Sequence, residues 1–506
     1  MGIIQKQGSK SSVFIFIGFI IGAFNMLVLF PYFLNTEQIG LTRAILDTGL
    51  TLATLCTFGT IPIINKFGPY YQNYLSVKKN DLPIITFAIG ITGFALLLIL
   101  GFYNKEFILR KLGKSPSLVE HFNVIYPFTL LFMVFSWMEA FSWTIKKTVV
   151  TNFIKETLVR ILNSALILLY GLGYVDFKTF IILFSFTYLL PVVILGITLV
   201  KSGEWSFNLI SFSSVTKRLK GRIINFSLFL FAGQFFNILA KTNDTFLIVG
   251  LKGLSDAGIF TIAVYLATII EIPQRSILSI SVPVLSESWR VKNYKNINDI
   301  YTKSVSNLML LACFLYGLIL LNMNNLIEFM NLVSHKNASD FSPLFNLFLI
   351  LGLGKLIDMS TGMNGAIIGT SNYWKFDFIS NLIFIVTAIP LNFILINHFG
   401  LTGLAISNLG TLLIFNLIRY IFLFKKFKFQ PYQFKHLLLL LAFGTMLFLI
   451  NLIPHLNGFV LDGLIRSLIY LVVFYAMVYW IKPAPELTNM FFDFLEKKNI
   501  KILKRF

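Results

Sequence analysis

Long apolar runs separated by short polar segments make up almost the whole chain. Crossing about 30 Å of hydrocarbon takes roughly 17–25 residues of helix, and fourteen runs are long enough to do so. They cover residues 11–34, 43–66, 82–103, 121–143, 152–171, 176–200, 222–250, 257–283, 301–322, 342–369, 375–397, 399–424, 435–454 and 463–481. The runs lack the alternating pattern of a membrane barrel, so each is predicted to be a transmembrane helix. We therefore expect an all-α integral membrane protein.

Composition and charge support this class and indicate an orientation. Of the 506 residues, 56% are hydrophobic and 13% charged, a balance that a soluble globule does not have. Most of the 42 Lys and Arg fall in tails and loops on the side of the N-terminus, and the positive-inside rule then predicts that both termini are cytoplasmic. Membrane orientation accounts for the net charge of +20, so no nucleic-acid partner is expected.

The short loops leave no room for a soluble domain, and the chain divides into helical segments. We expect a cytoplasmic N-tail (1–10), a six-helix lobe (11–200), a cytoplasmic interfacial linker (201–221), a second six-helix lobe (222–424), helices 13 and 14 (425–481) and a cytoplasmic amphipathic tail (482–506). A weak repeat relates TEQIGLTRAI, containing Gly40, to LSDAGIFTIA, containing Gly258. A parallel repeat of six helices predicts lobes related by a pseudo-two-fold axis along the membrane normal.

Ionisable residues inside predicted spans are the first candidates for function, because each is costly to bury in lipid. Four pairs are spaced three or four residues apart: Glu156 with Arg160, Lys241 with Asp244, Glu271 with Arg275, and Lys355 with Asp358. Each pair either neutralises itself or lines a wet cavity. Asp47 and Glu139, without an obvious partner on their own helices, either bond to another helix or titrate in an ion pathway. Arg419 and Arg466 are expected to reach the membrane surface from helix ends.

Two of these pairs continue into longer polar stripes, which favours the cavity interpretation. On the seventh span Gln234, Asn237, Lys241 and Asp244 follow steps of 3, 4 and 3 and share one helix face. On the eighth span a similar stripe comprises Thr261, Tyr265, Thr268, Glu271, Arg275 and Ser279. Cys56 and Cys313 lie inside apolar runs and the histidines do not cluster, so no metal, disulfide or cofactor is expected.

Three segments resemble the polysaccharide and O-antigen flippases of the multidrug, oligosaccharidyl-lipid and polysaccharide exporter superfamily. They are NFILINHFGLTGLAISNLG (392–410), NDTFLIVGLKGLSDAGIFTIA (243–263) and GLTRAILDTG (40–49). Many relatives carry an arginine directly after the aspartate that matches Asp244, whereas this chain has Thr245. The layout of fourteen spans with a break after the sixth is also similar.

The resemblance implies a non-enzymatic transporter of the bacterial cytoplasmic membrane with a central cavity that opens alternately to each side. Its substrate would be an undecaprenyl-diphosphate-linked oligosaccharide destined for cell-surface polysaccharide such as lipopolysaccharide, with a proton or sodium ion as coupling partner. The cations expected to shield the diphosphate are Arg43, Lys241, Arg275 and Lys355. The polar and acidic cavity residues expected are Asp47, Glu139, Gln234, Asn237, Asp244, Tyr265, Glu271, Asp358 and Asn364.

Two other functions stay open from the sequence. A drug or cation antiporter of the same superfamily would favour acids over cations in its cavity, whereas this chain has a surplus of intramembrane Lys and Arg. A membrane-embedded polysaccharide polymerase or ligase would act on the same lipid-linked sugar, but it would be expected to need a large outer loop, and the sequence has none.

Overall fold

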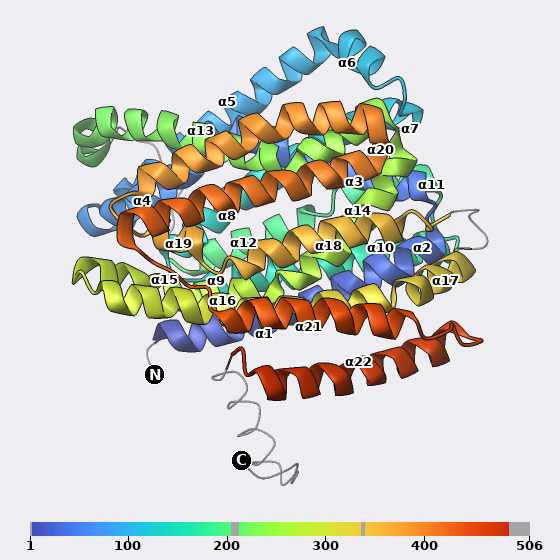
Figure 1. Ribbon diagram of the computed structural model, residues 1–506. Helices are drawn as coiled ribbons and strands as arrows, with labels where there is room; N and C mark the ends of the chain where they lie inside the picture. The colour runs from blue at the N-terminus through green and yellow to red at the C-terminus, as the bar shows by residue number, and fades with distance from the viewer. Residues whose placement is uncertain (1–2, 204–211, 335–339, 485–506) are drawn as a thin grey trace. The chain divides into compact units, whose positions relative to one another are not determined.

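The computed structural model describes residues 3–203, 212–334 and 340–484, and these residues form helices and connecting turns without a strand (Figure 1). The predicted linker falls partly outside the described residues, and the predicted amphipathic tail does so from residue 485 onward. The contacts between helices divide the chain into two units: unit 1 holds residues 1–261 and 333–339, and unit 2 holds residues 262–332 and 340–506. The boundary lies inside a helix rather than at 201–221, because the helix from Ser214 packs on the first unit.

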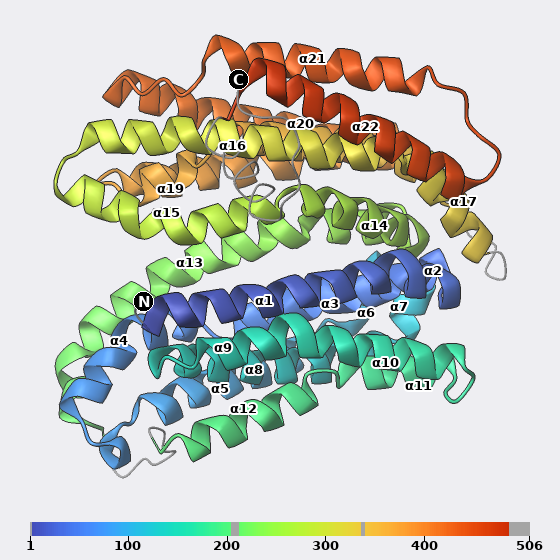
Figure 2. The ribbon, with the colours of Figure 1, turned by 90° about the horizontal axis from the view of Figure 1, so that it is seen from below.

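The first helix of unit 1 continues through a π-helical turn to Phe33. A series of helices follows as far as Lys201, and then one long helix begins at Ser214. Its elements are α1 (Ile3–Phe24), η1 (Asn25–Leu29), α2 (Phe30–Phe33), α3 (Thr36–Cys56), α4 (Thr60–Tyr74), η2 (Val77–Lys79), α5 (Leu82–Tyr103), α6 (Lys105–Lys111), α7 (Pro116–Glu120), η3 (Phe122–Val124), α8 (Ile125–Thr144), α9 (Thr148–Asn152), η4 (Phe153–Leu158), α10 (Val159–Gly171), α11 (Phe177–Ser185), α12 (Leu189–Lys201), α13 (Ser214–Leu251) and the start of α14 (Leu254–Ile270). Figure 2 shows α1 alongside α9 and α10, which it contacts.

Unit 2 takes the remainder of the chain. Its elements are the end of α14, α15 (Ile272–Arg290), α16 (Tyr294–Leu321), most of α17 (Met323–Val333), α18 (Leu344–Ser360), α19 (Asn364–Gly369), α20 (Trp374–Phe427), α21 (Phe434–Asn451) and α22 (Phe459–Ile481). α20 contains two of the predicted spans, which meet at Gly400, where φ is 62° and ψ is −143°. Glycine adopts this backbone geometry without the steric cost that a side chain would add.

The fourteen predicted spans lie largely in helix, so the all-α membrane class is confirmed. Four of them, 43–66, 176–200, 257–283 and 342–369, each run across a short break between two helices. Among the described residues, nine helices are long and apolar enough to cross a membrane, or ten if α14 and α15 form one bent span. The 53-residue run in α20 holds two predicted spans. The predicted spans 152–171 and 342–369 do not meet this test within the described residues, and both carry intramembrane charges.

The repeat glycines touch each other's helices within unit 1. A Cβ on Gly40 of α3 would lie 1.8 Å from the carbonyl oxygen of Leu254, and a Cβ on Gly258 of α14 would lie 2.0 Å from that of Thr36. The pairs 40–254 and 36–258 are exchanged by the offset of 218 residues that relates the two motifs. The hydroxyls of Thr36 and Ser255 hydrogen-bond beside this contact at 2.7 Å. This reciprocal contact has the form that a local two-fold axis between α3 and α14 requires.

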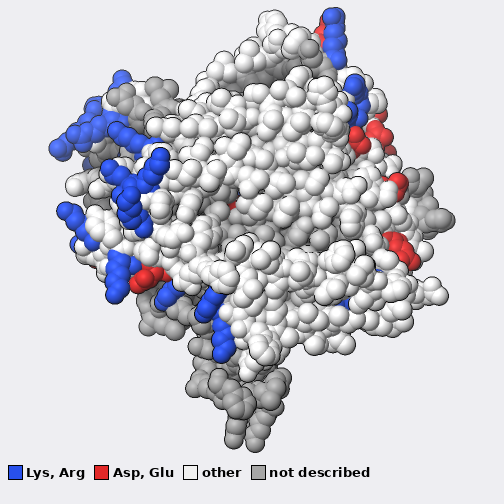
Figure 3. Space-filling view, viewed as in Figure 1, with Lys and Arg blue, Asp and Glu red and all other residues white. Residues whose placement is uncertain are grey.

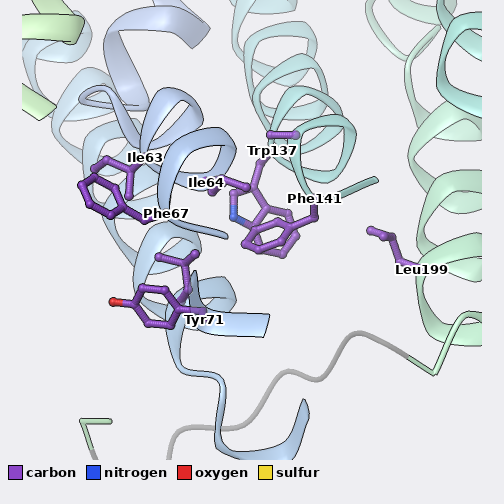
Figure 4. Packing of buried hydrophobic residues seen from close by; sticks show 9 residues of the cluster. Ile63, Ile64, Phe67, Tyr71, Trp137, Phe141 and Leu199 are labelled. Atoms are coloured by element: carbon purple, nitrogen blue, oxygen red, sulfur yellow. The ribbon is translucent and has the colours of Figure 1, made fainter. Parts of the chain in front are cut away.

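A buried cluster in unit 1 fixes the orientation of α8 (Figure 4). Trp137 and Phe141 of α8 pack with Ile64 and Phe67 of α4. The Trp137 indole N–H donates to the Thr86 hydroxyl at 3.0 Å, so its buried polar atom is satisfied. Because this face of α8 is held in the core, the residues on the other face point to a different environment.

On the face drawn in Figure 3, Lys and Arg gather at helix ends, and the surface between the ends carries few charges. In unit 1 the ends of α4 and α5 that meet the start of α13 carry Lys78, Lys79 and Lys217. The opposite helix ends carry acids such as Glu37 and Asp176. Such a basic end is what the positive-inside rule expects of a cytoplasmic side.

Candidate functional site

Unit 1 has a half-open cavity of about 350 Å³ between α3, α4, α8, η4 and α13. Its polar lining consists of Thr54, Thr57, Ser136, Glu139, Trp143, Lys155, Gln234, Asn237 and Lys241. Apolar side chains including Leu50, Phe132 and Ile238 complete the wall. An apolar pocket with a few convergent polar groups is the usual form of a small-molecule site.

The α8 side of the cavity follows directly from helical periodicity. Ser136, Glu139 and Trp143 are spaced by three and four residues and share one face. The opposite face carries Trp137 and Phe141, which are held in the core by α4. The charge at position 139 is therefore turned into the cavity by the packing of its neighbours.

Glu139 forms an ion pair with Lys155 across the cavity wall. The Lys155 ammonium lies 3.2 Å from each oxygen of the Glu139 carboxylate. The Glu139 side chain is 8% exposed and that of Lys155 is 39% exposed, so only the lysine has open access. Of the two alternatives for Glu139, the structure supports a bond to another helix.

Sequence analysis missed Lys155 as the partner of Glu139. The neighbouring pair Glu156–Arg160 does form, with an Arg160–Glu156 distance of 3.1 Å, but the residue before it, Lys155, pairs with a different helix. Lys155 lies in the π-helical turn η4, whose register differs from that of an α-helix. The sequence contains one indication of this pair: Glu139 is an acid inside a predicted span with no partner on its own helix. Such a group needs a cation from another helix.

The polar stripe predicted on the seventh span faces this cavity. Gln234, Asn237 and Lys241 of α13 all belong to the lining, whereas Asp244, one turn further on, is not among the lining residues. Two lysines and one glutamate thus line the same space. A cavity with this surplus of cations is suited to an anionic group.

Asp47 lies outside the cavity lining and joins α3 to α13. Its carboxylate is 1% exposed and accepts from Arg43 Nε at 2.8 Å and from Thr245 Oγ1 at 2.5 Å. The expectation that Asp47 lacks a partner on its own helix was wrong, since Arg43 is four residues earlier. Thr245 occupies the position where many relatives of the resembled family carry arginine, and it binds the acid through its hydroxyl instead.

In unit 2, the charged residues have partners other than those expected from spacing. Lys355 donates to Glu271, which precedes α15, and the Asp358 carboxylate accepts from Asn416 Nδ2 at 2.8 Å. Asp358 still attracts the Lys355 charge, so contacts between helices add to the pairing expected on one helix. Arg275 is exposed. The neutralisation of Lys355 thus depends on the tertiary fold as well as on one helical turn.

Asn364 belongs to a buried amide network and is 4% exposed. The Asn416 side-chain oxygen accepts from Thr361 Oγ1 at 2.8 Å and from Asn364 Nδ2 at 2.9 Å. Thr361 and Asn364 flank the break between α18 and α19 at Gly362. These bonds hold the broken helix to α20 and engage the amide that was expected to line the cavity.

Arg419 and Arg466 are buried rather than extended to a membrane surface, so that expectation was wrong. The Arg419 side chain is 11% exposed, donates to Asp377 and lies over the Phe415 ring at 3.9 Å. Arg466 is 2% exposed and its Nε lies 2.6 Å from Asp462. Each arginine has an acid within its own unit, and this removes the need to reach water.

The thirteen predicted site residues thus fall into separate groups. Glu139, Gln234, Asn237 and Lys241 meet in the unit 1 cavity. Arg43 and Asp47 pair elsewhere in that unit, and Asp244 also lies in unit 1 outside the cavity lining. Tyr265, Glu271, Arg275, Lys355, Asp358 and Asn364 belong to unit 2. Trp143 and Lys155 line the cavity without having been predicted. Among the described residues, no group of three or more His, Cys, Asp or Glu could hold a metal ion.

The fold and cavity define a many-helix membrane protein with a small polar chamber inside its first unit. No family model and no curated protein sequence matches the chain. Among solved structures it is similar to the lipid II flippase MurJ in an inward closed conformation, with a TM-score of 0.72 and 17% identity over 93% of this chain and 98% of that one.

Two further solved structures are transporters of the MATE family. A multidrug resistance MATE transporter of the MOP superfamily, in an inward-facing conformation, matches with a TM-score of 0.55 and 13% identity over 81% of this chain and 93% of that one. A MATE structure in the bent conformation matches with a TM-score of 0.52 and 14% identity over 83% and 95%. The chain has the fold shared by MurJ and these transporters.

Proposed function

We propose that the chain is a flippase that moves an undecaprenyl-diphosphate-linked oligosaccharide from the inner to the outer leaflet, without covalent chemistry. The observation that carries this proposal is the unit 1 cavity, where Lys155 and Lys241 accompany a single acid, Glu139. A diphosphate crossing hydrocarbon needs cations, and two lysines can supply them as compact donors. The fold shared with a lipid II flippase supports the same class of transport.

The orientation in this proposal places both termini in the cytoplasm of a bacterial inner membrane. The basic helix ends near Lys78, Lys79 and Lys217 would then face the inner leaflet, as the positive-inside rule expects. Trp143, at the last turn of α8, would lie toward the inner mouth of the cavity. Arg275 and Lys355 are proposed as further head-group contacts in unit 2.

A drug or cation antiporter is the second candidate, supported by the fold shared with MATE transporters. The cavity lining argues against it, because two lysines repel a cationic drug unless a second acid balances them. The two candidates therefore differ in the sign of the ligand charge. A polymerase or ligase lacks such support, since the similar structures named are transporters.

Transport in liposomes tests the proposal. The purified protein, reconstituted with lipid-linked oligosaccharide extracted from a bacterial host, should move the head group to the opposite leaflet, as measured by access of a sugar-binding lectin. Lys155→Met and Lys241→Met should each reduce the rate at least tenfold, whereas Lys178→Met, an exposed site outside the cavity, should not. Uptake of a cationic dye with no lipid movement would overturn the flippase and favour the antiporter. Repeating the assay with imposed proton and sodium gradients identifies the coupling ion.

A further inference from the structure

Trp143 is the one large aromatic ring of the cavity lining that combines exposure with a fixed orientation. Its side chain is 43% exposed although it lines a chamber in the helical interior of unit 1. Trp137, six residues earlier on the same helix, is 4% exposed and packed in the core. The two tryptophans of α8 therefore have different roles, and that of Trp143 is not core packing.

The indole of Trp143 is held from its edge, which leaves the ring faces for contact. Its Nε1–H donates to Thr151 Oγ1 at 3.1 Å, and the Thr151 hydroxyl donates in turn to the carbonyl of Thr148 at 2.9 Å. Thr151 is fully buried. A tryptophan whose polar edge is already bonded presents a rigid apolar face with little entropy left to lose.

A second observation points to a ligand that brings a hydrogen-bond donor. The side-chain oxygen of Gln234, a residue that lines the same cavity, is buried and makes no hydrogen bond within the described residues. A buried acceptor without a donor is costly. When the Gln234 side chain turns toward the cavity, a hydroxyl of a ligand can satisfy this oxygen, and Asn237 lies one turn further along the same wall.

From these observations we infer that Trp143 is the stacking platform for the first sugar ring of the substrate, with Gln234 accepting a hydroxyl of that sugar and Lys155 binding the adjacent phosphate. The inference rests on the proposed function and adds the carbohydrate part of the site. Position 143 is four residues from Glu139, the partner of Lys155, which is about 6 Å along a helix.

Ring chemistry explains why a sugar suits this position. The axial hydrogens of a pyranose form an apolar patch that packs on an aromatic face, while its hydroxyls need acceptors at the rim. Trp143 supplies the face and Gln234 an acceptor. A planar aromatic drug could stack on the same ring but would leave the Gln234 oxygen unsatisfied.

Binding of small head-group analogues to the full-length protein tests the inference. Affinities for inorganic phosphate and for glucose 1-phosphate are measured by calorimetry on protein in detergent. The sugar should add about tenfold in affinity to the wild type. Trp143→Ala should remove that gain while phosphate binds as before, and Trp143→Phe should keep most of it. Trp480→Ala, at a site 82% exposed and outside the cavity lining, is the matched control and should leave both affinities unchanged.

Each outcome distinguishes the inference from the proposed function. The sugar platform is overturned if the wild type binds the two ligands equally well, or if Trp143→Ala keeps the wild-type ratio of the two affinities. Phosphate binding that depends on Lys155 would still leave the flippase proposal standing. Loss of phosphate binding in the wild type would instead count against the flippase. If Trp143→Ala melts at a lower temperature than the wild type, two other variants decide the result. Trp143→Phe should keep most of the sugar-dependent gain in affinity, and Gln234→Met should reduce it.

Discussion

Replacing Gly40 with alanine should force α3 and α14 apart. The new methyl group would lie 1.8 Å from the Leu254 carbonyl oxygen, whereas an ordinary contact begins at 3.4 Å. The helices must therefore separate locally by about 1.6 Å, the difference between these two distances. Such a shift would also break the 2.7 Å hydrogen bond between Thr36 and Ser255. The obstacle is backbone, so no side chain can rotate away to relieve it.

The expected loss of stability follows from the steric overlap and from the broken hydrogen bond. Overpacking of a tight contact costs about 1–3 kcal/mol, and the lost hydrogen bond adds roughly 1 kcal/mol. Gly40→Ala should thus lower the free energy of unfolding by about 2–4 kcal/mol. Gly258→Ala should behave alike, since its methyl would lie 2.0 Å from the Thr36 oxygen. The double variant should lose less than the sum, because both methyls push the same two helices apart.

Thermal unfolding of the purified protein in detergent measures the effect, and Gly250→Ala is the matched control. Gly250 lies in helix α13 of the same unit, and a Cβ there would have no neighbour within 4 Å. Alanine is the better helix former, so this control should melt at the wild-type temperature or slightly above it. If Gly40→Ala melted as high as Gly250→Ala, the close contact between α3 and α14 would be refuted. Strict additivity in the double variant would refute the shared mechanism.

Three further substitutions test the buried charges by the same unfolding assay. Lys155→Met should cost about 1–3 kcal/mol by leaving the buried Glu139 carboxylate unpaired, less than for a fully buried pair because Lys155 is 39% exposed. Glu139→Gln in the same chain should restore most of this loss, and equal stability of the single and double variants would contradict it. Thr245→Val should cost about 1–3 kcal/mol, because Asp47 loses its bond to α13, and an unchanged melting temperature would exclude that bond. Arg466→Met should destabilise strongly while the exposed Arg290→Met has no effect; the reverse order would show that Arg466 reaches solvent.

Helix positions were predictable because hydrophobic length decides them. The predicted spans lie largely in helix, including the charged spans 152–171 and 222–250, whereas the breaks inside 43–66 and 342–369 were not predicted. The irregular turns were not predictable, since they arise from contacts between helices. Gly18 of α1, for example, packs against the backbone of Glu156 in the π-helical turn η4, where a Cβ would lie 2.1 Å from the carbonyl oxygen.

Charge partners were predictable only in part. The pair Glu156–Arg160 follows the helical spacing, and Arg43–Asp47 shows the same spacing but was overlooked. Partners on other helices, such as Glu271 for Lys355, cannot be predicted from the spacing of residues along one helix. A charged side chain is long and finds whichever opposite charge the fold brings near, so spacing on one helix is a weak guide to pairing.

The two amides that share a stripe on α13 were the better indicators of the site, whereas the isolated amide Asn364 was not. Gln234 and Asn237 cannot be neutralised by a neighbour on their helix, and hydrocarbon offers them no hydrogen bond. Their shared face on α13 therefore has to meet water, another polar helix or a ligand, and it lines the cavity. Lysines and acids inside predicted spans can instead be neutralised by ion pairing and need not face a cavity, as the bond between Lys355 and Glu271 demonstrates. In a helical membrane protein, a stripe of amides thus constrains the position of a cavity more tightly than a pair of charges does.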